Sequence, residues 1–95
     1  KERILEATKL REMEVTRSQA LEEEFLEELV FESQEMRERW RTDQHWLVTA
    51  VDVHRYALAV CRNHEQEWRK RGWVGEMNDF AKRLSDLLWS IRNSR

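Results

Sequence analysis

The chain contains no proline and only two glycines, Gly72 and Gly75, in 95 residues. These two residue types supply most of the tight turns that join strands in hairpins, sandwiches and barrels. Their scarcity excludes an all-β fold and favours a few long helices joined by short connections. A chain of this length has material for one hydrophobic core, so we expect a single small domain.

The clearest helical pattern lies near the C-terminal end, over residues 76–93. Apolar residues recur there at intervals of three and four, which places them on one side of a helix. They are Met77, Phe80, Ala81, Leu84, Leu87, Leu88 and Ile91. On the opposite side, Asp79 precedes Arg83 by four residues, the order that favours an ion pair along a helix.

The same spacing predicts a second helix over residues 44–71. Its apolar stripe comprises Trp46, Ala50, Val53, Ala57, Val60, Cys61, His64 and Trp68. Three basic residues, 69–71, and then Gly72 mark its end, because cations favour the C-terminal end of the helix dipole and glycine adopts the left-handed cap. Only residues 73–75 follow before the last helix, so these two helices are predicted to form an antiparallel hairpin.

A third helix is predicted over residues 18–41. Its broad apolar face is made by Leu21, Phe25, Leu26, Leu29, Val30, Phe31 and Met36. Thr16 and Gln19 fit a capping box at its start. Residues 1–16 are helix-prone, but their apolar side chains form no single stripe, which indicates a weakly amphipathic N-terminal helix or arm.

The boundary between the second and third helices has two interpretations. Thr42 and Asp43 are suitable N-cap residues for a new helix. Because no glycine or proline lies nearby, residues 18–71 are also compatible with one continuous helix that pairs with another chain. In both cases we expect an all-α fold, a small antiparallel helical bundle built on the helical hairpin. In the continuous-helix case the long N-terminal helix completes its core through another chain.

The charges are divided unevenly along the chain. Residues 1–48 carry 13 acidic and 8 basic side chains, a net charge of −5, whereas residues 49–95 carry 6 and 9, a net charge of +3. This division favours packing of the two halves on each other, within one chain or between chains. A nucleic-acid binder would show a basic face overall, so nucleic acid is not the expected partner.

Two features of the sequence bear on cellular location: its single cysteine and the length of its longest uncharged run. Cys61 has no second cysteine to pair with and lies among apolar residues, which is typical of a core residue in a reducing, cytoplasmic compartment. The longest uncharged run, residues 44–51, is too short to span a membrane, and no secretory leader pattern is present. We therefore expect no membrane partner, and a chain that is a fragment of a longer protein.

Histidine, cysteine and glutamate occur together in the second predicted helix, but their spacing does not suit a metal. Along one line of this helix, His54 is followed by Cys61 seven residues later and by Glu65 eleven residues later. Residues seven apart on a helix are separated by about 10 Å, too far for ligands of one ion. Cys61 and His64 have the usual ligand spacing, and two residues do not make a site. No glycine-rich loop offers a phosphate cradle or an oxyanion hole. The sequence predicts no catalytic, cofactor or metal site.

Two resemblances to known families remain. Arg39 precedes His45 with the arginine-to-histidine spacing of HEPN-type ribonucleases, which are all-helical and often dimeric, although chance alone supplies such a spacing in a chain this rich in arginine. Residues 43–60 and 91–93 resemble short, largely uncharacterised bacterial helical proteins, over about a quarter of the chain. That resemblance implies an all-helical fold. It implies no activity, because Ser94 and Arg95 stand where those proteins carry an acidic residue and a histidine.

Five tryptophans in a chain this short are the strongest functional signal. Trp46 and Trp68 fall on the predicted buried stripe, whereas Trp40, Trp73 and Trp89 fall at helix ends or off the stripe and need contact with another surface. Tryptophan and arginine are enriched where one protein anchors on another. The alternative is that these aromatic side chains fill the core. The predicted interface residues are Trp40, Phe31, Val30, Trp73 and Trp89.

These observations predict a non-catalytic helical module for protein interaction or oligomerisation. Its expected partner is a second copy of the chain or another helical protein. The alternative function is a HEPN-like helical ribonuclease, or a nucleic-acid-associated domain, that acts as a dimer.

Overall fold

The computed structural model describes the backbone of residues 2–94 and the side chains of residues 9–94. Its elements are α1 (Glu2–Glu27), a short π-helical segment η1 (Glu28–Glu32), α2 (Gln34–Asp43), α3 (Ala50–Lys70) and α4 (Met77–Asn93). No strand occurs in the described part of the chain. The protein is a small all-α helical bundle, which confirms the predicted fold class.

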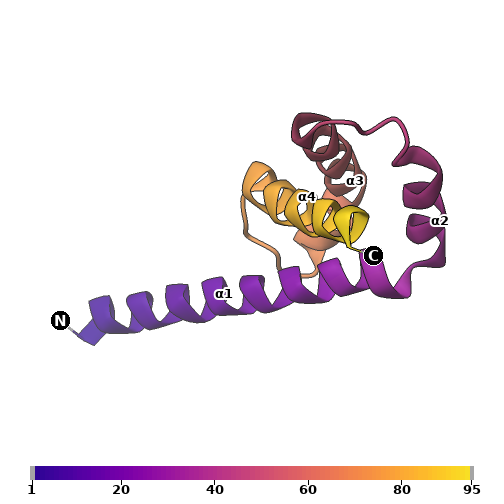
Figure 1. Ribbon diagram of the computed structural model, residues 1–95. Coiled ribbons are helices and arrows are strands. Elements are labelled where there is room, and N and C mark those ends of the chain that lie inside the picture. Colours follow the sequence, from indigo (N-terminus) through magenta and orange to yellow (C-terminus); the bar gives the residue numbers. More distant parts are fainter. Residues whose placement is uncertain (1, 95) are drawn as a thin grey trace.

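Helices α3 and α4 pack along each other as the predicted hairpin (Figure 1). Helix α3 begins later than the predicted residue 44, at a capping box. The Thr49 hydroxyl accepts a hydrogen bond from the backbone N–H of Asp52, and the Asp52 carboxylate accepts one from the backbone N–H of Thr49. The start near Thr42 and Asp43 was wrong because this reciprocal cap satisfies two otherwise unpaired N–H groups.

The hairpin connection follows the sequence prediction at its glycine. Gly72 has φ of 107°, the left-handed conformation expected after the helix. Helix α4 then starts one residue inside the predicted range, where the Glu76 carboxylate accepts a hydrogen bond from the backbone N–H of Asp79 at 2.9 Å. The Asp79 to Arg83 pair predicted along α4 is not formed, because Arg83 turns toward Glu22 and Glu23 of α1.

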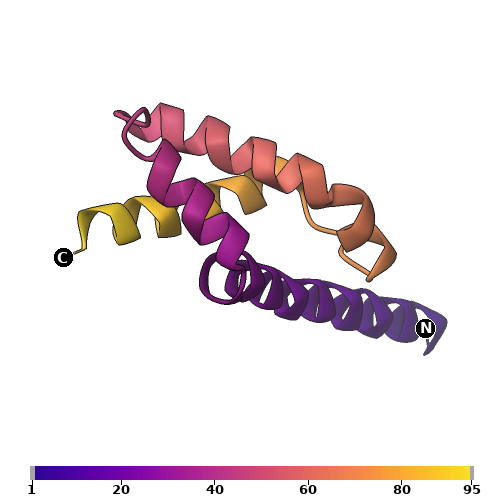
Figure 2. The ribbon, with the colours of Figure 1, turned by 90° about the vertical axis from the view of Figure 1, so that its right-hand side faces the viewer.

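Helix α1 crosses the hairpin and completes the core with its C-terminal half (Figures 1 and 2). Phe25 of α1 packs on Trp68 and Phe80 at the closed end of the hairpin, where Trp73 completes the cluster, and all four rings are almost completely buried. Trp68 lies at the centre of this cluster, with ring centroids 4.6 Å from Phe25, 5.1 Å from Phe80 and 5.9 Å from Trp73. Contacts among these rings bring together residues that are far apart in sequence.

The opposite charges of the two halves meet within one chain. Arg71 donates to both carboxylate oxygens of Glu28, at 3.2 and 3.3 Å, and to Glu24 at 3.2 Å. Arg83 makes the same kind of connection from α4 to Glu22, at 3.7 Å, and to Glu23. The acidic part of α1 is thus neutralised in part by its own hairpin.

The helix predicted over residues 18–41 is interrupted. The backbone N–H of Ser33 donates to the carbonyl of Glu28 at 2.7 Å, closing a π-type turn, and Ser33 itself is extended. The Ser33 hydroxyl then caps α2 by accepting from the backbone N–H of Met36 at 3.2 Å. The chain changes direction here, so α2 packs across the other end of the hairpin and no continuous helix over residues 18–71 exists.

The N-terminal half of α1 extends beyond the bundle (Figures 1 and 2). The molecule measures 56 Å along its long axis and 23 Å across. Helix α1 runs without a break through the predicted start at Thr16 and Gln19. Every side chain from residue 9 to residue 17 is exposed, and Ser18 is the first buried one.

Across the described residues, none of the helices combines the length with the apolar composition that crossing a bilayer requires.

Candidate protein-interaction site

Three of the five predicted interface residues line one apolar pocket. Val30 and Phe31 of η1 and Trp40 of α2 meet α4 there and enclose a volume of about 220 Å³. The full lining is Val30, Phe31, Met36, Arg37, Trp40, Leu88 and Ile91. Arg37 supplies the lining's single charged side chain, so the pocket offers mainly apolar contact surface.

The π-turn determines which residues line this pocket. Its hydrogen bond spans five residues instead of the four of an α-helix, so one extra residue is accommodated in this turn between α1 and α2. As a result Val30 is buried, at 7% exposure, while the neighbouring Phe31 is 58% exposed. An aromatic ring that exposed stands at the rim of the pocket, where another molecule reaches it first.

The floor of the pocket is held in place by contacts between α2 and α3. The Trp40 ring lies 5.6 Å from the Tyr56 ring, and the Tyr56 hydroxyl lies 4.0 Å from the sulfur of Met36. Trp40 is 7% exposed. Its cover therefore comes mainly from its own chain, and it contributes a wall of the pocket rather than a projecting anchor.

A polar groove adjoins the apolar pocket and shares Phe31 with it. The groove runs between α1 and α4 and has a volume of about 580 Å³. Its lining is Glu23, Leu26, Glu27, Phe31, Arg83, Asp86 and Leu87. Three carboxylates face one guanidinium there, so the groove is acidic beside an apolar end.

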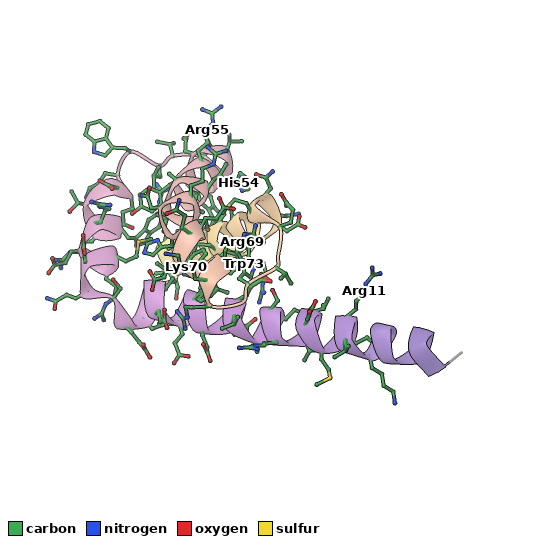
Figure 3. All side chains as sticks on the ribbon, turned by 180° about the vertical axis from the view of Figure 1, so that it is seen from behind. Arg11, His54, Arg55, Arg69, Lys70 and Trp73 are labelled. Carbon is green, nitrogen blue, oxygen red and sulfur yellow. The ribbon has the colours of Figure 1, made fainter. Side chains whose placement is uncertain are left out.

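Trp73 was predicted to need an outside surface, but the chain covers it. The indole is 1% exposed and packs between Trp68 and Phe80. The Arg69 guanidinium lies 4.0 Å from its ring centroid, and Figure 3 shows the two residues together. The expectation that Trp73 lies off the core was wrong, because the hairpin connection folds back over the aromatic cluster.

Trp89 is the fifth predicted interface residue. It is half-buried, packs against the edge of the core, and carries the Arg92 guanidinium 5.3 Å from its ring centroid. Leu88 and Ile91 of the same helix line the pocket, whereas Trp89 does not. Its role in an interface stays a prediction.

The most exposed tryptophan is one that the sequence analysis placed in the core. Trp46 is 80% exposed, and the nearby Val48 and Val51 are 67% and 60% exposed. Trp46 precedes the start of α3 and therefore does not share the helix's buried stripe. The pattern Thr49-x-x-Asp52 was the available signal, since a capping box there leaves Trp46 outside the helix.

The residues considered for metal binding and nucleophilic catalysis have structural roles. Cys61 is fully buried, and burial raises the pKa of its thiol to about 12. The Nδ1 atom of His64 lies 3.0 Å from the carbonyl of Val60, and its ring stacks on Trp68. Among the described side chains, no group of three histidine, cysteine or carboxylate residues is arranged around a common ion position.

Arg39 and His45, which carry the HEPN-type spacing, are both exposed. Arg39 lies in α2 and lines a small polar pocket with Asn63 and His64 of α3. His45 lies in the turn after α2 and is not part of that pocket. The described hydrogen bonds do not join Arg39 to His45.

Comparisons of the chain with protein-family models, with curated proteins and with solved structures found no match.

Proposed function

We propose that this protein is a non-catalytic helical module that binds another protein through the apolar pocket between η1, α2 and α4. The observation that carries the proposal is the exposed Phe31 ring at the rim of a pocket with an otherwise almost entirely apolar lining. Concave apolar surfaces with an aromatic rim are typical places for an anchoring side chain of a partner.

The chemistry of the pocket suits an aliphatic or aromatic side chain. Val30, Leu88 and Ile91 offer dispersion contacts, and the Arg37 guanidinium is available to the face of an aromatic ring or to a carboxylate beside it. The preferred partner is therefore an amphipathic helix that presents one large apolar residue, in line with helix-in-groove recognition.

Indole is a suitable probe, because it is the side chain of an anchoring tryptophan without a peptide attached. We expect indole to shift the side-chain N–H resonance of Trp40 in a nitrogen-15 correlation spectrum, and imidazole, a polar ring, to leave it unchanged. Ile91→Trp fills the pocket and is expected to abolish the response. An equal response at Trp46, which lies outside the pocket, would mean that indole binds without a site.

The ribonuclease alternative requires a different test. An HEPN-like enzyme would cleave RNA, and Arg39→Ala and His45→Ala would each abolish the cleavage. The interaction module is expected to leave RNA intact before and after these substitutions. Cleavage by the unaltered chain that is lost in both variants would replace the proposal.

We also infer a reducing compartment such as the cytoplasm. Support comes from Cys61, a lone cysteine that is fully buried and held as the neutral thiol by its raised pKa. A thiol in this state is a small apolar core residue and needs no oxidising environment.

A further inference from the structure

A second surface lies on α1, away from the apolar pocket. Exposed residues follow one another at alternating intervals of four and three along α1, which places them on one face of the helix. They are Lys9, Met13, Thr16, Ala20, Glu23 and Glu27, and we call them the α1 face. Thr16 and Ala20, at its centre, are small and allow another helix to approach closely.

The α1 face is charged in opposite senses at its two ends. Lys9 lies in the part of α1 that extends beyond the bundle, and Glu23 and Glu27 lie beside α4. From Ser18 to Met36 the sequence contains no lysine or arginine, and it contains seven glutamates. Some of these glutamates pair with Arg71 and Arg83, but neither Lys9 nor Glu27 has an ion-pair partner among the described side chains.

This charge order is self-complementary only for antiparallel helices. Consider two copies of α1 that run in opposite directions, with their midpoint at the level of Ser18 along the helix axis. Lys9 then lies opposite Glu27 of the other copy, and Thr16 lies opposite its Ala20. Each of these contacts occurs twice because the arrangement is two-fold symmetric. Parallel pairing would instead place Lys9 against Lys9 and Glu27 against Glu27, which is repulsive.

The extended half of α1 also gains from such a partner. Most of the stability of a helix in a protein comes from packing of one face, and every side chain of residues 9–17 is exposed. In the antiparallel arrangement they lie along the acidic groove between α1 and α4 of the other copy, beside Glu23, Glu27 and Asp86. Met13, which is 67% exposed, is covered there as well.

We propose that two copies of this chain pair through their α1 faces in antiparallel orientation, with Lys9 of each copy bound to Glu27 of the other. This goes beyond the proposed pocket function by giving the chain a second interaction surface, with a second copy of the chain as its partner. The α1 face shares no residue with the lining of the apolar pocket, and the groove beside it meets that pocket only at Phe31.

Sedimentation equilibrium of the full chain at low ionic strength tests the pairing. We expect the mean mass to rise from monomer toward dimer between about 10 μM and 1 mM protein, as a contact of mainly exposed ion pairs implies weak binding. Lys9→Glu and Glu27→Lys are each expected to weaken dimerisation about tenfold, because each creates two like-charge contacts. The double variant is expected to restore the dissociation constant to within about threefold.

Arg11→Glu is the matched control, because it makes the same charge change in the same extended segment (Figure 3). Arg11 follows Lys9 by two residues and therefore points about 200° away around the helix. It is expected to change dimerisation less than about threefold. All of the substituted side chains are exposed, so helix content by circular dichroism is expected to stay unchanged.

Three results would overturn the pairing: a monomer mass at every concentration, single reversals that have no effect, or a double variant as weak as the single variants. None of these bears on the pocket, whose response to indole at Trp40 is measured at high ionic strength, where the ion pairs of the α1 face are screened. Conversely, loss of the indole response with a normal dimer would refute the pocket function alone.

Discussion

Phe25 of α1 stacks face to face on Trp68 of α3, with ring centroids 4.6 Å apart and ring planes inclined by 10°. The Arg71 guanidinium lies on the Phe25 ring as well, 4.7 Å from its centroid, while its charge is paired with Glu24 and Glu28. One aromatic side chain of α1 thus contacts both an aromatic ring and a guanidinium of the hairpin.

Removal of this ring tests its role. Phe25→Ala is expected to lower the free energy of unfolding by about 3–5 kcal/mol, because it leaves a cavity beneath Trp68 and Phe80. Phe31→Ala makes the same chemical change at an exposed position and is expected to cost less than about 0.5 kcal/mol. Urea denaturation of the two variants measures both values. Equal losses would show that α1 does not depend on the Phe25 ring for its packing.

Substitution of Trp40 and of Trp46 compares a buried tryptophan with an exposed one. Trp40→Ala is expected to lower the melting temperature by roughly 10 °C or more at any protein concentration, because its buried ring packs on Tyr56. Trp46→Ala is expected to shift it by less than about 2 °C. A change in oligomer mass for Trp40→Ala, without a change in melting temperature, would restore Trp40 as an interface anchor.

The Trp73 indole lies so close to Gly75 that it leaves no room for a side chain at that position. A Cβ atom at this position would lie 2.8 Å from Cε2 of Trp73, a separation that real Cβ contacts essentially never show, and the indole is 1% exposed. Gly75→Ala is therefore expected to destabilise the protein by about 1–3 kcal/mol through overpacking. Gly72→Ala is the comparison, because the nearest atoms to a Cβ there are 3.8 Å away, so its cost comes from the φ of +107° and not from overpacking. Thermal unfolding compares them, and equal stability of Gly75→Ala and the unaltered chain would contradict the packing described for Trp73.

Ionisation of Glu22 is expected to contribute to the pH dependence of the free energy of unfolding. Burial raises the pKa of this carboxyl above its ordinary value, and the nearby Arg83 opposes the effect only in part. A carboxyl with a raised pKa in the folded state costs stability while it is ionised, and this cost is relieved as the pH falls through the raised pKa. Glu22→Gln is therefore expected to be more stable than the unaltered chain at pH 7.

Denaturant titrations at several pH values check this prediction. The advantage of Glu22→Gln is expected to shrink as the pH falls toward 4.5, the ordinary pKa of a glutamate carboxyl, because the unaltered carboxyl then takes up its proton. The exposed Glu27→Gln is the control. If Glu22→Gln loses stability at pH 7, the ion pair with Arg83 outweighs the cost of burial, and the sign of the argument is wrong.

The helical class, the hairpin and the core of α4 were predictable from local information. The spacing of Phe80, Leu84 and Leu88 depends only on the geometry of a helix, and the left-handed Gly72 only on the absence of a side chain. The end of α3 and the start of α4 follow for the same reason. The capping box at Thr49 and Asp52 was equally local, and its use would have placed Trp46 outside α3.

The candidate site was predictable only in part. Val30, Phe31 and Trp40 were chosen as interface residues from their types and positions, and the structure brings them to one pocket; their role in binding stays a prediction. The exposure of each could not be derived from the sequence. It depends on the π-turn at residues 28–32, which shifts the helical register by a residue and has no distinctive sequence pattern.

By itself, the sequence determined that this chain forms amphipathic helices, because helix geometry, capping and the lack of turn residues are local properties. Only the tertiary structure decided which apolar side chains are covered and which partners the charges find. Trp73 is buried because the connection folds over Trp68, and Arg83 pairs with α1 instead of Asp79 because α1 crosses α4 at that point. Periodicity along one helix indicates which face is buried, but the cover of a side chain outside that face and the partner of a charge depend on groups brought together from distant parts of the chain.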